Sequence, residues 1–492
     1  MPSPSNNAPT PDYDVLIVGA GISGISAACH LRMNCPDRRF RIVEARDSFG
    51  GTWDLFRYPG IRSDSDMHTF GFSFRPWTSP VALADGPSIL AYLEDTIKEY
   101  DLAPDIDFGR RVVAASWSDD DRYWTVTLDS GDGDRQQLSC RVLFMCSGYY
   151  RYDAGYTPEL PGLQDFRGTL VHPQHWPEGL DYRGKRIAVI GSGATAVTLV
   201  PALAGQAAKV AMIQRSPTWV VSLPREDRLA KLTNRLLPQR WAYRITRWRN
   251  IRLQNFIYKR SRNKPAKVRR LLLRLARKHL GEDFDVQTHF TPDYDPWTQR
   301  MCLIPDADLF LALRSGKAAV VTGEIDHIGA DAVHMRSGEA IQADILVTAT
   351  GLQLQLLGGA EFTLNGEPID FSERIAYQGM MYSGVPNLVQ TFGYINASWT
   401  LRADLNSRFV CDMLNHMRAT GTQVCTPVLS EEERTMPTRD WVTDFNPGYF
   451  QRALHLFPRQ GTHVPWRNTQ NYLLDRKLLR RAAEQSDSLS YR

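Results

Sequence analysis

The chain has 492 residues, with 58 Lys plus Arg against 54 Asp plus Glu and a formal net charge of +4. Its hydrophobic content of 43% is too high for a disordered protein, and its length allows several packed domains. The seven cysteines are scattered and form no CxxC pair. This arrangement argues against a disulfide framework, a zinc ribbon and a dithiol redox centre.

The N-terminal residues, Met1 to Asp12, are rich in Pro, Ser and Asn and lack the charged start and apolar core of a signal peptide. We expect a loose tail there and a cytoplasmic protein. The sequence has no run of about 18 uncharged apolar residues, which argues against a transmembrane span and leaves peripheral membrane association open.

The first motif is a glycine-rich turn between an apolar run, Tyr13 to Val18, and a helix-forming stretch. The turn fits the pattern GxGxxG with Gly19, Gly21, Ile22, Ser23 and Gly24. The first glycine permits a tight turn, the second lets the backbone approach a pyrophosphate, and the third allows close helix packing. Glu44, at the end of the next strand, can accept a hydrogen bond from a ribose hydroxyl. The pattern predicts a dinucleotide site, with a purely structural turn as the alternative.

A second turn of the same kind follows the apolar run Arg186 to Ile190. It consists of Gly191, Ser192, Gly193, Ala194, Thr195 and Ala196. After the next strand, Arg215 and Ser216 stand where the first repeat has its acid. A guanidinium and a hydroxyl can bind a 2′-phosphate that a carboxylate would repel, so this site should prefer NADP over NAD. The alternative is that Arg215 lies on a solvated turn.

Two such modules indicate a resident flavin and a nicotinamide that reduces it. We therefore predict an α/β fold with two Rossmann-like dinucleotide-binding domains and a basic helical insertion. Residues 1–155 would begin the FAD domain and residues 341–492 would return to it and wrap the C-terminus around it. Residues 156–340 would form an inserted NADPH domain, with the helical insertion at about 225–290.

Two longer motifs resemble those of the type I Baeyer-Villiger monooxygenases, a class of flavoprotein monooxygenases. The family fingerprint FxGxxxHxxxW, followed by Pro or Asp, is matched by Phe166, Gly168, His172, Trp176 and Pro177. A second family pattern runs from a pair of glycines, here Gly50 and Gly51, to an acid, here Asp64, and it includes Thr52 and Trp53. The chain is similar to a mycobacterial branch of this family that oxidises thioamides. The resemblance implies tightly bound FAD, with NADPH and O2 as co-substrates.

The resemblance also implies the chemistry. In this family a C4a-peroxyflavin attacks a ketone, and the resulting adduct rearranges to an ester or lactone; sulfides or thioamides are oxidised as well. Arg300 matches the family's active-site arginine, and Asp64 matches the acid that pairs with it near the flavin. Arginine suits a dry pocket because it keeps its charge there. The alternative is an ordinary ion pair between two domains. In the family the fingerprint lies at the interdomain linker, so we expect His172 and Trp176 to act in gating.

Two rival functions remain. One is a flavin-containing monooxygenase that acts only on nitrogen or sulfur, against which Trp176 and Asp64 argue. The other is a non-catalytic, membrane-associated flavin sensor, against which Arg300 and the two complete turns argue. No cluster of His, Cys, Asp or Glu has the spacing of metal ligands, so no metal site is predicted.

Residues 225–278 are strongly basic, with 19 Lys plus Arg against only Glu226 and Asp227, which leaves 39 basic and 52 acidic residues elsewhere. Apolar residues recur there every three or four positions, which predicts amphipathic helices broken at Pro238 and Pro265. A solvated basic face packed on the domain is one interpretation. A second is attraction to anionic membrane, which would deliver a small lipophilic ketone or sulfur substrate. Nucleic-acid binding is disfavoured because no recognition motif accompanies the charge.

Overall fold

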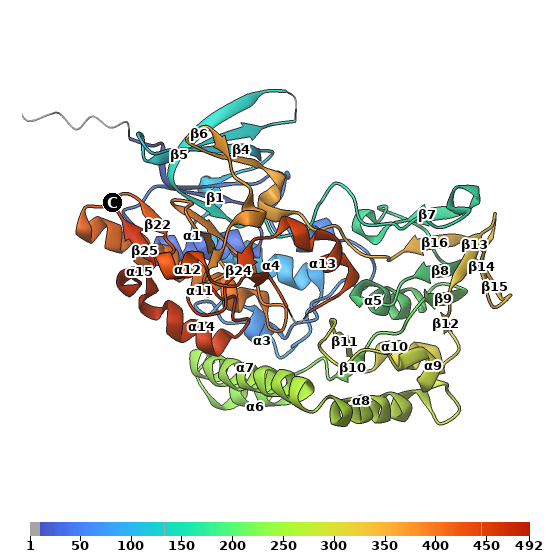
Figure 1. Ribbon diagram of the computed structural model, residues 1–492. Helices are drawn as coiled ribbons and strands as arrows, with labels where there is room; N and C mark the ends of the chain where they lie inside the picture. The colour runs from blue at the N-terminus through green and yellow to red at the C-terminus, as the bar shows by residue number, and fades with distance from the viewer. Residues whose placement is uncertain (1–9, 132, 444) are drawn as a thin grey trace, which may run out of the picture.

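Two sheets of mainly parallel strands, with helices packed against them, organise the chain (Figure 1). The computed structural model describes residues 10–131, 133–443 and 445–492. The tail expected at Met1 to Asp12 therefore lies largely outside the described residues. Among those residues, no helix combines the length and the apolar composition that a membrane span requires.

The first sheet has nine strands, and both ends of the chain contribute to it. Its order is β18-β17-β4-β5-β6-β1-β2-β3, with β21 also paired to β6. The N-terminal strands are β1 (Tyr13–Val18), β2 (Phe40–Val43), β3 (Ile106–Asp107), β4 (Arg111–Ser118), β5 (Tyr123–Asp129) and β6 (Arg135–Met145). The returning strands are β17 (Glu361–Leu364), β18 (Glu367–Pro368) and β21 (Leu388–Gln390). Since β1 pairs in parallel with β2 and β6, the first glycine turn leaves the middle of this sheet.

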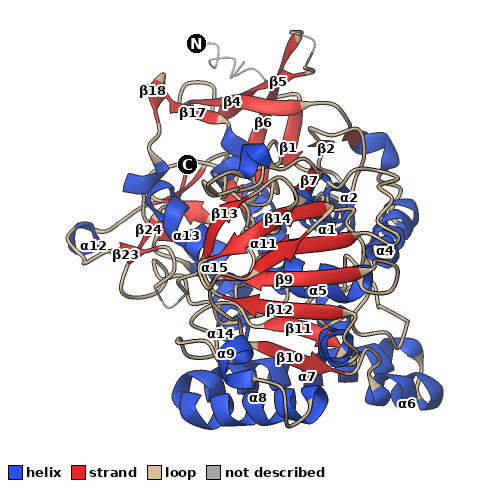
Figure 2. Ribbon diagram, turned by 90° about the vertical axis from the view of Figure 1, so that its right-hand side faces the viewer, coloured by secondary structure: helices blue, strands red, loops and turns tan. Residues whose placement is uncertain are grey.

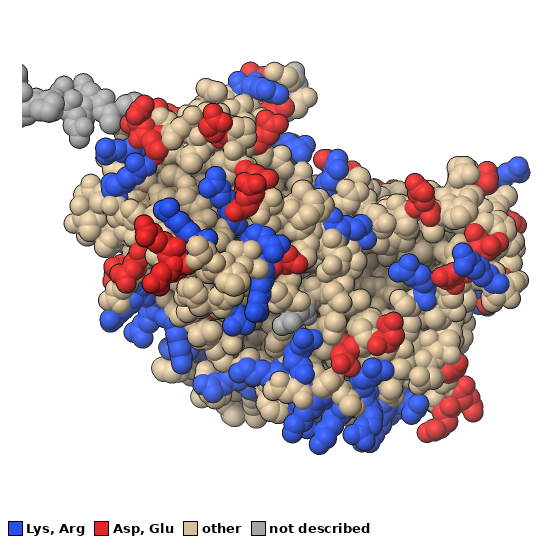
Figure 3. All heavy atoms as spheres, viewed as in Figure 1, with Lys and Arg blue, Asp and Glu red and all other residues tan. Residues whose placement is uncertain are grey.

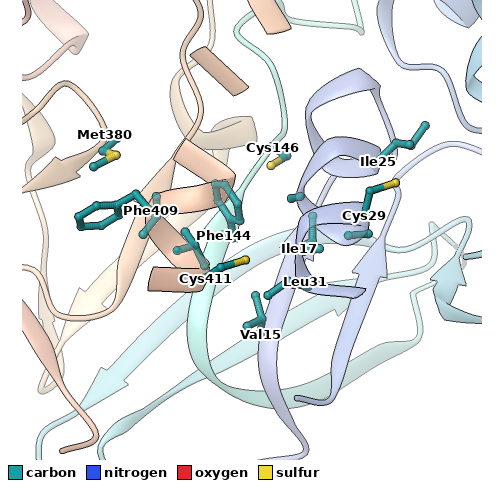
Figure 4. Packing of buried hydrophobic residues seen from close by; sticks show 14 of the residues in the cluster. Val15, Ile17, Ile25, Cys29, Leu31, Phe144, Cys146, Met380, Phe409 and Cys411 are labelled. Carbon is teal, nitrogen blue, oxygen red and sulfur yellow. The ribbon is translucent and has the colours of Figure 1, made fainter. Parts of the chain in front are cut away.

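Helices α1 (Ile22–Asn34), α4 (Gly86–Glu99) and α11 (Trp399–Thr420) pack beside this sheet. Figure 4 shows Ile17 of β1, Cys29 of α1, and Phe409 and Cys411 of α11 among the buried residues of this core. All seven cysteines are buried and free of disulfides, and those in this core pack as small apolar groups.

The second sheet contains the second glycine turn. Its order is β12-β9-β8-β16-β7, and all its pairs are parallel. The strands are β7 (Thr169–Val171), β8 (Arg186–Ile190), β9 (Lys209–Gln214), β12 (Ala318–Thr322) and β16 (Ile345–Thr348). One face packs on α5 (Ala194–Leu203), α8 (Pro265–Leu280), α9 (Val286–Phe290) and α10 (Asp308–Arg314). The other face packs on an antiparallel sheet of β13 (Ile325–Ile328), β14 (Ala332–Met335) and β15 (Ala340–Gln342).

The segment 56–62 of the first half of the chain reaches into this second unit. Phe56 and Tyr58 belong to the apolar core on the α5 side of the second sheet. Gly60 lies so close to α5 that an added Cβ would stand 2.7 Å from the Cβ of Ala202. Arg62 donates to Asp308 at 2.6 Å. This segment therefore fastens the two sheets together.

The basic segment folds into helices where its prolines predict boundaries. Helix α6 (Arg228–Leu236) ends before Pro238, α7 (Gln239–Asn263) follows it, and α8 begins at Pro265. Figure 2 shows these three helices along one edge of the molecule. Helix α7 contacts α3 (Met67–Phe70), which belongs to the first half of the chain.

The remaining elements are short. The helices are α2 (Thr52–Leu55), α12 (Glu431–Arg434), α13 (Gly448–Ala453), α14 (Tyr472–Leu478) and α15 (Ala482–Gln485). Two-stranded pairs are β10 (Val220–Leu223) with β11 (Cys302–Pro305), β19 (Ala376–Tyr377) with β20 (Met381–Tyr382), β22 (Cys425–Pro427) with β25 (Leu489–Tyr491), and β23 (Arg439–Asp440) with β24 (Arg459–Gln460).

Candidate active site

A cavity of about 1230 Å³ is lined by residues of both glycine turns. Most of the predicted cofactor residues line it: Gly19, Gly21, Ile22, Ser23, Glu44, Gly51, Thr52, Trp53, Asp64, Gly191, Ser192, Gly193, Ala194, Thr195, Arg215 and Ser216. Gly24 and Ala196 are buried behind the lining. The strand ends at 146–148 and 349–351 also border the cavity.

The first turn has the shape that a pyrophosphate needs. Gly19 has φ +106°, and a Cβ there would stand 2.7 Å from the carbonyl oxygen of Cys146. A Cβ on Gly24 would stand 1.8 Å from the carbonyl oxygen of Gly19, so only glycine lets α1 start this close to the turn. Gly21 caps α1 without a side-chain hydrogen bond, which leaves the amides of the first helical turn available to an anion.

Glu44 is buried beside this turn and holds it in place. Its Oε2 accepts from the amide of Ala20 at 2.7 Å, and its Oε1 accepts from the amide of Arg46 at 3.0 Å. Burial raises the pKa of this carboxyl, and the two amide bonds oppose that rise. Because each carboxylate oxygen can accept more than one hydrogen bond, Glu44 can still bind a ribose hydroxyl. The first turn therefore fits the adenosine part of FAD.

The second turn repeats this geometry with more open space. Gly191 has φ +141°, and a Cβ there would stand 2.2 Å from the carbonyl oxygen of Ala349. Gly193 caps α5 without a side-chain bond, and nothing lies within 4 Å of a Cβ placed there. Ser192 donates to the carbonyl of Ser216 at 3.0 Å, which ties the turn to the end of β9. The exposed Arg215 borders the same cavity and fits a 2′-phosphate.

Arg300 and Asp64 form a two-pronged ion pair in the cavity. Nε of Arg300 donates to Oδ2 of Asp64 at 2.8 Å, and Nη2 donates to Oδ1 at 2.7 Å. The negative charge of Asp64 raises the pKa of Arg300, which burial alone would lower. Arg300 precedes β11, whereas Asp64 lies in the loop before α3, so the pair joins distant parts of the chain.

Three tyrosines near Arg300 were not among the predicted site residues. Tyr149, Tyr150 and Tyr449 line the cavity, and burial raises the pKa of each, so their phenols are neutral at physiological pH. The hydroxyls of Tyr149 and Tyr150 are 2.7 Å apart. The ring of Tyr149 also stacks on Trp399, with centroids 5.2 Å apart. These aromatic residues lie in loops or at helix starts, where no periodic pattern could have identified them.

The fingerprint residues lie behind the cavity. Nδ1 of His172 accepts from the amide of Gln174, and burial lowers the pKa of His172, which favours the neutral ring. The side chain of Gln174 donates to the carbonyls of Arg151 and Tyr152, at the crossing between the two sheets. Phe166 and Trp176 pack on opposite faces of the second sheet, Gly168 lies close to the carbonyl oxygen of Asp344, and Pro177 follows Trp176.

Two dinucleotide turns that open on one cavity define a flavin- and nicotinamide-binding oxidoreductase. Residues 67–289 match the family described as flavin-binding monooxygenase-like, and residues 17–82 match the NAD(P)-binding Rossmann-like domain. The FAD-containing monooxygenase EthA of Mycobacterium tuberculosis is 50% identical to this chain over 483 residues, which is 98% of each chain. The probable FAD-binding monooxygenase AlmA of Acinetobacter baylyi is 47% identical over 95% of this chain and 94% of its own. The chain belongs to the family of FAD-containing monooxygenases.

Solved structures share the fold. A steroid monooxygenase bound to NADP has a TM-score of 0.78 at 23% identity, covering 97% of this chain and 99% of its own. OTEMO in complex with FAD and NADP has a TM-score of 0.77 at 19% identity, covering 98% and 100%. An open cyclohexanone monooxygenase has a TM-score of 0.75 at 20% identity, covering 98% and 99%. The predictions of a two-dinucleotide α/β fold and of a flavoprotein monooxygenase are confirmed.

Proposed function

We propose that this enzyme is an NADPH- and O2-dependent Baeyer-Villiger monooxygenase, which inserts oxygen next to a ketone carbonyl to give an ester or lactone. It would also oxidise sulfides or thioamides. The observation that supports this proposal is the Arg300–Asp64 pair in a cavity lined by both glycine turns. The names of the steroid and cyclohexanone monooxygenases that share the fold agree with it. When bound, FAD would supply hydride uptake and oxygen activation.

Each cofactor has its own residues. Gly19, Gly21 and the start of α1 would bind the pyrophosphate of FAD, and Glu44 its ribose. Gly191, Gly193 and the start of α5 would bind the pyrophosphate of NADPH, with Arg215 and Ser216 on its 2′-phosphate. Both helix starts border the same cavity, which is lined by Gly21 and Ile22 as well as by Gly193 and Ala194.

Arg300 supplies a fixed cation at the reaction site. Asp64 holds Nε and Nη2, so the remaining donors of the guanidinium stay available to negative charge that develops on substrate or oxygen. Tyr149, Tyr449 and Trp399 line the same cavity, and together with the bound cofactors they would limit the access of water to Arg300. His172 and Trp176 of the fingerprint would act at a distance, by coupling movement between the two sheets to cofactor handling.

We infer that the substrate is a small lipophilic ketone or sulfur compound. The aromatic residues near Arg300 favour an apolar molecule with one polar group over a charged one. Such a molecule partitions into lipid, and peripheral contact of residues 225–278 with anionic membrane would place the enzyme at its source.

Replacing Arg300 by Ala tests the proposal. We expect the variant to bind FAD and to consume NADPH, but to form no ester, because the cation at the reaction site is gone. Arg186→Ala removes an exposed pair with Asp344 far from the cavity lining and is the matched control, which should keep product formation. Normal ester formation by the Arg300 variant would refute the assignment.

A panel of linear, aryl and cyclic ketones together with thioethers separates the remaining alternatives. Formation of esters supports the Baeyer-Villiger activity. Sulfoxides without any ester would indicate the monooxygenase that acts only on nitrogen or sulfur. Absence of NADPH consumption with every substrate would favour the non-catalytic flavin sensor.

A further inference from the structure

Residues 225–278, which we call the basic edge, contain α6, α7 and α8. In Figures 1 and 2 the three helices follow one border of the molecule. In Figure 3 the blue spheres of Lys and Arg gather along this border, whereas acidic side chains are spread over the rest of the visible face. None of the residues proposed to bind the cofactors or to act at the reaction site belongs to this surface.

The inner side of α7 is attached to the enzyme by polar contacts. Arg247 is buried and donates to the carbonyls of His68, Thr69 and Gly71 at 3.1, 2.9 and 2.7 Å. Asn250 donates to Asp66 at 2.8 Å. These bonds fix which side of the helix faces the protein and which side faces outward.

The outward side of α7 carries large apolar residues that the fold leaves uncovered. The side chains of Trp241, Trp248 and Phe256 are 57%, 56% and 59% exposed. Ten of the nineteen exposed large hydrophobic residues in the described chain fall within residues 232–271. This arrangement is the opposite of an ordinary surface helix, which turns its apolar side inward. The interpretation of residues 225–278 as a merely solvated basic face does not explain it.

Cations surround these apolar groups. Fifteen of the nineteen Lys and Arg residues of the basic edge are exposed. The guanidinium of Arg244 lies 5.1 Å from the ring centre of Trp241, and that of Arg252 lies 4.4 Å from the ring centre of Trp248. Both acids of the segment already have partners, since Asp227 pairs with Arg249 and Glu226 lies 3.6 Å from Lys231.

We propose that the basic edge docks peripherally on a membrane surface that contains anionic lipid. Trp241, Trp248 and Phe256 would enter the headgroup region, while the neighbouring Lys and Arg side chains contact lipid phosphates. A second copy of the chain is a poor occupant, because two such basic surfaces would repel each other. Aliphatic groups such as Leu236, which is 68% exposed, suit a lipid interface better than the stacked bases of a nucleic acid.

Docking in this way would bring the substrate side of the cavity near lipid. Ile251 of α7 packs with Tyr394 and Leu401, and Tyr394 lines the cavity. The packing of Ile251 on Tyr394 thus connects α7 to the lining of the cavity. This consequence rests on the proposed function, whereas the docking itself does not and is measured without turnover.

Flotation of the FAD-loaded enzyme with vesicles tests the docking. One set of vesicles is phosphatidylcholine alone, and the other contains about one third phosphatidylglycerol, a fraction that gives an anionic surface. We expect flotation with the anionic vesicles at low salt, loss of most of it at high salt, and little flotation with the neutral vesicles.

Two triple variants separate the contributions. Trp241→Ser, Trp248→Ser and Phe256→Ser together remove the apolar contacts, and Arg244→Gln, Arg252→Gln and Arg260→Gln together remove charge. We expect each to weaken binding to the anionic vesicles by at least about tenfold. The matched controls lie outside the basic edge: Leu170→Ser with Leu311→Ser, and Lys185→Gln, Lys209→Gln and Lys317→Gln. They should bind as the unaltered enzyme does.

Several results would overturn the docking. These are failure of the unaltered enzyme to float at low salt, equal flotation with neutral vesicles, or equal loss of binding in the control variants. Self-association that the aromatic variant abolishes, or duplex DNA that binds more tightly than the anionic vesicles at the same salt, would also reject it. Unchanged melting temperatures and FAD content establish that the variants are folded. If either triple variant fails that check, the dependence of flotation on salt and lipid, measured with the unaltered enzyme, still tests the docking.

Discussion

Replacing Asp64 by Ala removes both hydrogen bonds that position Arg300. Hydrogen bonds to charged groups contribute about 1.5 to 3 kcal/mol when water is excluded. The side chains of Arg300 and Asp64 are 37% and 26% exposed, so water screens the pair and replaces part of what is lost. We therefore expect a coupling energy of about 1 to 2 kcal/mol between the two residues, above that of an exposed pair and below that of a fully buried one.

A double-mutant cycle measures this coupling. The free energy of unfolding is determined by urea denaturation for Asp64→Ala, Arg300→Ala and the double variant, each saturated with FAD. The double variant should lose less stability than the two single variants together, by the coupling energy. Asp64→Ala should also form about tenfold less oxygenated product per NADPH consumed, because its Arg300 is present but no longer held in place.

The pair between Arg186 and Asp344 provides the control cycle. It has similar two-pronged geometry but is 45% and 35% exposed and lies away from the cavity lining, so its coupling should be clearly smaller than that of Arg300 with Asp64, and its variants should form product normally. A coupling near zero between Asp64 and Arg300, together with unchanged product yield in Asp64→Ala, would refute the positioning role.

Three further predictions follow from other parts of the structure. Arg215→Glu should raise the KM for NADPH about 10- to 100-fold and leave the KM for NADH nearly unchanged, and equal effects on both would exclude 2′-phosphate recognition. Burial lowers the pKa of His172 from its usual 6.5, so the unfolded chain binds a proton that the folded chain rejects, and stability falls as the pH drops below that value. His172→Gln should therefore flatten the decrease of Tm between about pH 7 and 5, and an unchanged slope would contradict this. Asp475→Ala removes the carboxylate that lies 2.7 Å from the buried guanidinium of Arg402, so it should lower the free energy of unfolding, measured by urea denaturation, by about 3 to 5 kcal/mol. A decrease below about 1 kcal/mol would contradict this prediction.

The parts of the fold that could be predicted are those with a local signal. Glycine spacing identified both turns, because at Gly19, Gly24 and Gly191 a Cβ would collide with a nearby carbonyl oxygen. Proline positions identified the boundaries of α7 and α8. In contrast, the antiparallel pairing of β5 with β4 and β6 was not predicted, since it depends on neighbours elsewhere in the sheet.

The parts of the site that could not be predicted depend on long-range contacts. Glu44 was expected to face a ribose, but its bonds to the turn amides depend on how β2 lies beside β1. Tyr149 lies in a loop and Tyr449 lies in α13, 300 residues further along the chain, and only folding brings them to one cavity. Helical periodicity revealed that α7 is amphipathic, but it could not reveal that the apolar side points outward, which the buried contacts of Arg247 decide.

The insertion of residues 56–62 into the second sheet's core bears on engineering by domain exchange. A nicotinamide module cut at the linker near residue 155 would leave Phe56 and Tyr58 behind, and its core would lose two aromatic side chains. A chimera between relatives should therefore transplant this short segment together with the module. For the same reason, proteolysis at the linker should not release a free fragment. Residues 56–62 belong to the first part of the chain but pack in the core of the second sheet, so they would hold the two cleaved parts together.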